Sequence, residues 1–325
     1  MSEASKVSQL EFSDLYLGHP SLADRFSDVP GASTNPLPAG PALRNDLDQL
    51  TGMCRDALKT TPSAREFKVH YDGITYRASL MHALSGDVFV LRKMAGIIHS
   101  LEELGIPKAY VRHLMTRDLS GLLVISGAIK AGKTMTAYAT VKDRLTAYGG
   151  VAITMEDPVE IPMEGSHGQG VCFQTTVPCD RNGFADAFRH LTRWGARIIL
   201  IDEIRDQETA AEVLQASISG HLIVTTMLAE NVIQTISKLH GMANCKLAPG
   251  SSQSLLADGL VGVLHQKIAR GSMPKLETEF LFLKDAPVIK SVLRSGKYET
   301  LASDIRHQMT SMITENAAAR RRMEA

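Results

Sequence analysis

The stretch GAIKAGKT, residues 127–134, decides how the rest of the chain is interpreted. A glycine, four further residues and then Gly-Lys-Thr form the spacing of a phosphate-binding loop. The run before it, residues 121–126, is short, apolar and β-branched and is typical of a buried strand, whereas residues 135–148 lack Gly and Pro and favour a helix. Strand, glycine-rich turn and helix are the context that this motif requires, so the pattern predicts a nucleotide site. The alternative is a chance match in a glycine-bearing turn.

The residue types in the loop explain how it could hold a phosphate group. Glycines let backbone N–H groups point inward at an anion, and the N-terminus of the following helix adds a favourable dipole. Lys133 is expected to reach the β- and γ-phosphates, and the Thr134 hydroxyl is expected to bind Mg²⁺. The expected cofactors are therefore ATP and Mg²⁺. The expected nucleotide-binding residues are Gly127, Ala128, Ile129, Lys130, Ala131, Gly132, Lys133, Thr134 and Met135.

Length and charge narrow the class of protein. The chain has 325 residues, enough for about two domains. Lys plus Arg and Asp plus Glu both number 35, and this zero net charge counts against broad electrostatic binding to nucleic acid. Because no apolar run approaches the ~20 residues of a membrane span, we expect a cytoplasmic protein. The four cysteines contain no C-x-x-C pair, which favours free thiols over a zinc site.

The pattern of the chain changes at Gly121, and we place the domain boundary at 112/113, within the segment 100–118 that links the two domains. Residues 1–112 combine a helical stretch with a predicted hairpin and further strands, which indicates a small α+β domain. Residues 113–325 alternate strands with helices, which predicts an α/β domain with a mostly parallel sheet. Its expected elements are strands at 151–155, 197–202 and 222–227, and helices at 184–194, 207–217, 230–242, 254–265 and 298–325.

Acidic residues close two of the predicted strands. The apolar run 198–201 leads into Asp202 and Glu203, and a second apolar strand ends at Glu156. Since active sites of open α/β sheets gather at the carboxyl ends of strands, we expect these side chains beside the phosphate loop. Glu203 is expected to orient the attacking water, with Asp202 as the alternative or as a group near Mg²⁺. His221, before the next strand, is expected to sense the γ-phosphate, although a lone histidine is more often structural.

The order of these motifs resembles a known family. GxxxxGKT, TxEDPxE, IxxxDEIRDxET and SGHLxxTT look like the phosphate loop, aspartate box, second acidic box and histidine box of the secretion ATPases of type II and type IV systems, including type IV pilus retraction motors. The resemblance runs over about residues 12–294. Residues 275–314 are most similar to the ATPase of type IVB secretion and plasmid conjugation.

This resemblance implies a fold, an activity and partners. It implies a RecA-like core that follows a PAS-like N-terminal domain, in a ring-forming, hexameric ATPase. Such a motor would power a secretion, conjugation or pilus machine, and would be peripheral to the inner membrane through partner proteins. Glu203 would be the main catalytic carboxylate, Glu156 would help position water and Mg²⁺, and His221 would sense the γ-phosphate. Arg77 and Arg92 would reach the nucleotide from the N-terminal domain and stabilise charge on the transferred phosphoryl group.

Several positions allow a second interpretation or depart from the family. Arg189 and Arg193 match arginines on the helix before the second acidic box, or are surface charges. Leu228 stands where the family has a second histidine, and Ser85 where the retraction motors have a third arginine. The segment WGAR, 194–197, replaces an acidic stretch. Two alternatives therefore stay open, a RecA-like motor acting directly on nucleic acid and a nucleotide-binding subunit with weak turnover.

Overall fold

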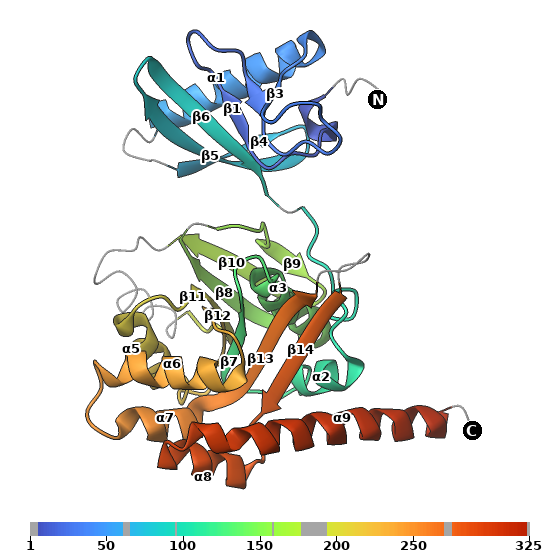
Figure 1. Ribbon diagram of the computed structural model, residues 1–325, viewed down its shortest axis with the longest axis vertical. Coiled ribbons are helices and arrows are strands. Elements are labelled where there is room, and N and C mark those ends of the chain that lie inside the picture. Colours follow the sequence, from blue (N-terminus) through green and yellow to red (C-terminus); the bar gives the residue numbers. More distant parts are fainter. Residues whose placement is uncertain are drawn as a thin grey trace. The chain divides into compact units, whose positions relative to one another are not determined.

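The computed structural model describes residues 6–60, 66–94, 96–157, 159–176, 194–269 and 275–323. The chain divides into two compact units, each visible in Figure 1. Unit 1 comprises Met1–Ile97 with Glu160–Pro162, and unit 2 comprises Ile98–Val159 with Met163–Ala325. The division of the sequence into functional domains at residue 112 stays a prediction.

Unit 1 is an antiparallel sheet with a helix packed on it. Its six strands follow the order β3-β2-β1-β6-β5-β4. The predicted helix and hairpin are confirmed. The strands β2 and β3 were not predicted, because a strand of two residues is too short to show a sequence pattern. The carboxylate of buried Asp46, on α1, accepts hydrogen bonds from the Tyr71 hydroxyl at 2.8 Å and the Val7 N–H at 2.9 Å, and so ties the helix to the sheet. The elements are β1 (Leu15–Leu17), β2 (Arg25–Phe26), β3 (Leu37–Pro38), α1 (Arg44–Thr60), β4 (Glu66–Tyr71), β5 (Ile74–Ala83) and β6 (Gly86–Lys93).

Unit 2 contains an eight-stranded sheet in the order β14-β13-β7-β12-β11-β8-β10-β9. Only the two edge strands are antiparallel to their neighbours, so the expected mostly parallel α/β sheet is confirmed. The strands are β7 (Gly121–Gly127), β8 (Gly150–Glu156), β9 (Gly165–His167), β10 (Gly170–Thr176), β11 (Ile198–Glu203), β12 (Leu222–Leu228), β13 (Leu260–Ala269) and β14 (Lys275–Phe282). The described helices are α2 (Lys108–Leu114), α3 (Lys133–Tyr148), α5 (Gln207–Ala216), α6 (Val232–Asn244), α7 (Ser251–Gly259), α8 (Pro287–Ser295) and α9 (Leu301–Met323).

The central strands are covered on both faces, as a parallel sheet requires. Every residue of β7 is buried, which explains its unbroken apolar sequence. Alternate residues of the strands, such as Leu122 and Val124, join one large core with α5 to α9. The residues between them face the side on which α3 packs against β7, β8, β11 and β12. Helix α3 therefore runs along this face from the carboxyl end of β7 back to the start of β8.

The predicted helix at 254–265 is partly wrong. Helix α7 ends at Gly259, and β13 begins at Leu260. A short run such as LVGVL cannot be assigned to helix or strand by periodicity alone. Here it pairs with β7 on one side and β14 on the other, and residues 260–266 are all buried. The predicted helix at 184–194 falls almost entirely outside the described residues, of which Trp194 is the nearest.

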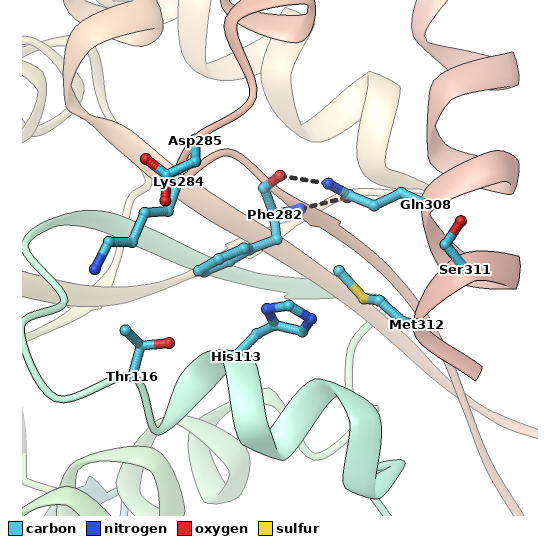
Figure 2. Close-up of a pocket in the computed structure, with 8 residues that line it drawn as sticks. All are labelled: His113, Thr116, Phe282, Lys284, Asp285, Gln308, Ser311 and Met312. Atoms are coloured by element: carbon cyan, nitrogen blue, oxygen red, sulfur yellow. Dashed lines mark hydrogen bonds between the residues drawn. The ribbon is translucent and has the colours of Figure 1, made fainter. Parts of the chain in front are cut away.

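The C-terminal helix is attached to the sheet by a side-chain amide (Figure 2). Gln308 of α9 accepts from the N–H of Phe282 at 2.8 Å and donates to its carbonyl at 2.7 Å. The Phe282 ring contacts the imidazole of His113 on α2, with centroids 4.8 Å apart. The two bonds satisfy both main-chain groups at the end of β14 and fix α9 beside it.

Candidate functional site

The loop between β7 and α3 has a backbone that only certain residues can adopt. Three of its residues have positive φ, namely Gly127 at 158°, Lys130 at 63° and Gly132 at 80°. A Cβ on Gly127 would lie 2.2 Å from the carbonyl oxygen of Gln266, so no larger residue fits there without a backbone shift. Successive turns of this kind present backbone N–H groups to one side and form a concave anion site. The predicted strand, turn and helix are thus confirmed.

Lys133 is the first residue of α3 and closes over the loop. Its Nζ donates to the carbonyl of Ala128 at 3.0 Å, and the residue is 8 % exposed. The ammonium group therefore lies beside the turn, where a bound phosphate would interact with both its positive charge and the N-terminus of α3. Thr134 follows it and is half-buried. The residues present therefore fit a phosphate group.

The acidic residues reach the same edge of the sheet as the loop. Glu156 is the last residue of β8 and Glu203 the last residue of β11, and β7, β8, β11 and β12 are mutually parallel. The carboxyl end of β7 is Gly127, so both carboxylates share its edge. The predicted convergence of the motifs at one sheet edge therefore agrees with the topology, whereas the chemical role of each residue stays a prediction.

Glu156 is held by two neighbours. It is 4 % exposed, and its carboxylate accepts hydrogen bonds from the hydroxyl of Tyr138, on α3, and from Nε2 of Gln174 at 3.0 Å. Burial, followed by the nearby Glu156 charge, raises the pKa of Tyr138 above its ordinary value, so the phenol keeps its proton and remains a donor. Sequence reasoning missed Tyr138 and Gln174, because neither lies in a recognised motif.

Asp202 and Glu203 both face the guanidinium of Arg205. The Arg205 Nε lies 3.3 Å from Glu203 Oε2, and its NH2 lies 3.9 Å from Asp202 Oδ2. The Thr134 hydroxyl and a carboxylate at Asp202 are the oxygen donors that Mg²⁺ prefers, with phosphate and water completing the shell. The residues thus fit the ion, although the described residues contain no cluster of three or more metal-ligating side chains of the His, Cys, Asp or Glu type.

His221 lies at the other edge of the sheet, so the structure does not place it beside the phosphate loop of its own chain, and its role as a γ-phosphate sensor stays a prediction. Its carbonyl accepts from the N–H of Gly121, at the amino end of β7, at 2.8 Å. The phosphate loop follows the carboxyl end, six residues on, which is about 20 Å at ~3.3 Å per residue. Its ring lies 3.3 Å from the Ser219 hydroxyl. The position level with Gly127 on β12 is instead Leu228.

A different histidine lies beside the loop. His265 on β13 is level with Ser126, and its Nδ1 is 3.3 Å from the Ser126 hydroxyl, to which Thr235 donates at 2.7 Å. Burial lowers the pKa of His265, which is 7 % exposed. It lines a hollow of about 670 Å³ together with Ala128, Ile129 and Leu228. Sequence reasoning missed His265, because it ends the stretch predicted to be helical.

Arg77 and Arg92 belong to unit 1 and lie directly opposite each other on β5 and β6. Arg77 forms an ion pair with Glu66 at 2.9 Å, and Arg92 forms one with Asp14 at 2.8 Å. The structure therefore places both guanidiniums on one face of the sheet, each next to a carboxylate. The two matched arginines at positions 189 and 193 lie outside the described residues.

The chain matches the family described as "Type II/IV secretion system protein" over residues 59–321. It is 32% identical over 222 residues to the type IV pilus assembly ATPase TfpB of Acinetobacter baylyi, covering 67% of this chain and 34% of that one. It is 34% identical over 202 residues to the type II secretion system protein HxcR of Pseudomonas aeruginosa, covering 61% of this chain and 40% of that one. The match thus spans between a third and two fifths of these relatives' length.

Solved structures share the fold. The pilus retraction motor PilT with bound ADP superimposes with a TM-score of 0.74 at 22% identity, covering 92% of this chain and 87% of PilT. The Legionella pneumophila ATPase DotB gives 0.68 at 18% identity, covering 91% and 84%. These likenesses confirm the expected two-part fold. None of the described helices has the length and apolar content that crossing a membrane demands.

Proposed function

The chain belongs to the type II/IV secretion system protein family, and on that premise we propose that it is a motor subunit that hydrolyses ATP. One observation carries the proposal. The phosphate loop at the carboxyl end of β7 shares its sheet edge with the carboxylates that end β8 and β11. A phosphate cradle with acidic side chains beside it is the arrangement that positions a triphosphate, a metal ion and an attacking water.

Each residue at this edge has a distinct part in the proposed reaction. The loop N–H groups and Lys133 bind the phosphates, and Thr134 and Asp202 would hold Mg²⁺. The ion, when bound, neutralises charge that develops on the phosphate oxygens. Glu203 orients the attacking water and accepts its proton. Glu156, fixed by Tyr138, holds the water shell from the side of β8.

Assembly and localisation form the second part of the proposal. We propose that the chain works as a ring of six copies, with an N-terminal domain over 1–112 and an ATPase domain over 113–325. In the closed arrangement Arg77 and Arg92 leave their carboxylate partners and approach a bound nucleotide. Their position opposite each other on β5 and β6 supports this, because one movement would deliver both guanidiniums. The ring acts at the inner membrane, on the proteins of a type IV secretion, conjugation or pilus machine.

Phosphate release from the purified, assembled chain tests the activity. Lys133→Ala removes the ammonium group from the loop and is expected to abolish turnover. Glu203→Gln keeps the size of the side chain but removes the proton acceptor, and is expected to bind ATP without hydrolysing it. Lys275→Ala, at an exposed position on β14, is the matched control and is expected to leave turnover unchanged. Turnover by Lys133→Ala at the parent rate would show that the site is elsewhere.

A nucleotide-binding subunit with weak turnover is the second candidate function. Leu228 favours it, because this apolar residue ends β12 level with Gly127, where a polar side chain could report on the γ-phosphate. Leu228→His is therefore expected to raise the rate of phosphate release if weak turnover is a property of the parent chain. If the parent chain releases several phosphates per second and Leu228→His releases them at the same rate, a nucleotide-binding subunit with weak turnover is excluded.

A further inference from the structure

A second cavity in unit 2 lies at the sheet edge opposite the phosphate loop. Its volume is about 170 Å³. The strands β8, β11 and β12 begin at its wall, whereas the loop follows the carboxyl end of β7, about 20 Å away along the strands. The lining residues are Arg117, Leu119, Arg144, Tyr148, Gly149, Gly150, Arg197, Ile198 and Leu222.

Arg144 is the most deeply buried charge in this cavity. It is 4 % exposed, and its terminal nitrogens donate to the carbonyls of Leu114 at 2.6 Å, Thr116 at 2.9 Å and Arg117 at 3.1 Å. Its Nε–H has no hydrogen-bond partner among the described residues. Burial lowers the pKa of Arg144 to about 10. A buried guanidinium with an unused donor is costly unless another group compensates it.

Two further arginines surround the same space. Arg117 and Arg144 lie over the ring of Tyr148, with guanidinium carbons 5.9 and 5.6 Å from the ring centroid. Arg197 approaches from the start of β11 and pairs with the exposed Asp118 at 3.3 Å. The repulsion between Arg197 and Arg144 is a further cause of the lowered pKa of Arg144, after burial.

The positive charge exceeds what the surrounding groups offset. The carboxylate of Asp118 neutralises one of the three guanidiniums. The C-terminal ends of α2 and α3 face this region, and each supplies a partial charge of about −0.5. About one positive charge is therefore left around this cavity to attract an anion. The Arg144 guanidinium is buried there, whereas the Arg117 and Arg197 side chains are exposed.

We propose that this cavity binds a small oxyanion of the phosphate class, either as the free ion or as the phosphate group of a small metabolite. Guanidinium groups recognise phosphate oxygens through charge-assisted hydrogen bonds. Arg144 has its Nε–H left for such a bond, and Arg117 and Arg197 line the same cavity. The volume exceeds the ~30 Å³ share of one water several-fold, which leaves room for a phosphate with a few waters. It is well below the ~300 Å³ at which ordinary ligand pockets begin, so a whole nucleotide does not fit.

The test must separate this cavity from the phosphate loop, which also attracts anions. Calorimetric titration of the full chain carrying Lys133→Ala, with inorganic phosphate against acetate at equal ionic strength, is expected to show one saturable site for phosphate. Adding Arg117→Gln and Arg197→Gln, which alter exposed side chains and spare the structural bonds of Arg144, is expected to weaken binding at least tenfold. Arg306→Gln, on the exposed face of α9, is the matched control and should leave the affinity unchanged.

Each outcome decides the proposal. Equal phosphate affinity with and without the two arginine substitutions, or no saturable phosphate binding at all, would overturn it. Glycerol phosphate distinguishes the sources, since its binding would identify a phosphate ester as the ligand class and its exclusion would identify the free ion. If the Lys133→Ala chain does not fold, the titration uses the otherwise unchanged protein. In that case the arginine substitutions must lower the number of bound phosphates by one.

Discussion

Replacing Tyr138 by phenylalanine isolates the bond that holds Glu156 beside the phosphate loop. The ring is 2 % exposed and keeps its packing in the variant, which loses the bond donated to Glu156 and a longer one accepted from Gln174 Nε2 at 3.4 Å. A hydrogen bond to a charged acceptor contributes about 1.5–3 kcal/mol. Because Gln174 continues to donate to the same carboxylate at 3.0 Å, we expect a loss of about 2 kcal/mol in the free energy of unfolding.

Urea unfolding of Tyr138→Phe, Glu156→Gln and the double variant measures this bond as a coupling energy. We expect a coupling of at least about 1 kcal/mol, since the two groups are in direct contact. Tyr298→Phe is the matched control in the same unit, because the Tyr298 hydroxyl is buried and has no partner among the described residues. Its removal is expected to be neutral or slightly stabilising. If Tyr138→Phe costs no more than Tyr298→Phe, the reasoning about Glu156 is refuted.

Three further predictions concern other parts of the chain. Gln308→Ala leaves both main-chain groups of Phe282 without their partner and should lower the free energy of unfolding by about 1–3 kcal/mol in urea, whereas a change within error would contradict the attachment of α9. Burial lowers the pKa of His265 and of His240 below the ordinary 6.5, so the unfolded chain binds more protons at these two residues than the folded chain. The free energy of unfolding should therefore fall as the pH drops below about 6.5. Measured by urea unfolding between pH 7.5 and 5.5, this free energy should depend less on pH in His265→Gln than in the parent, and an equal dependence would contradict the burial of His265. Cys245 is exposed and should react with a thiol reagent in the folded protein. Burial raises the thiol pKa of the other described cysteines, Cys54 and Cys172, to about 12, so these two should react only after unfolding. Mass spectrometry of labelled peptides measures the order of reaction, and labelling of Cys54 or Cys172 before Cys245 would contradict the prediction.

Local motifs made the core of the site predictable. The spacing of residues 127–134 implies its own backbone, because the glycines supply positive φ and the following run favours a helix. The strands that end at Glu156 and Glu203 could also be predicted, because a buried parallel strand is a short apolar run that ends in a polar residue. The shared edge then follows from parallel pairing.

The features that sequence patterns could not predict depend on contacts between distant segments. The motif containing His221 is recognisable, but only the register of β12 against β7 shows that this residue lies at the amino end of its strand. Strand β13 looked helical because a short apolar run has no clear period, and His265 was missed with it. The partners of Glu156 come from α3 and β10, and no pattern within a single stretch predicts such a hydrogen bond.

The most direct test of the central claim is calorimetric binding of ATP with Mg²⁺ to the parent chain and to Lys133→Ala. If the triphosphate lies in the loop between β7 and α3, the parent binds one ATP per chain and the variant loses at least about 2.7 kcal/mol of binding free energy, a hundredfold in affinity. Circular dichroism should show that the variant keeps its fold. Equal affinity in the two proteins would contradict the account, because the loop would then not be where the nucleotide binds.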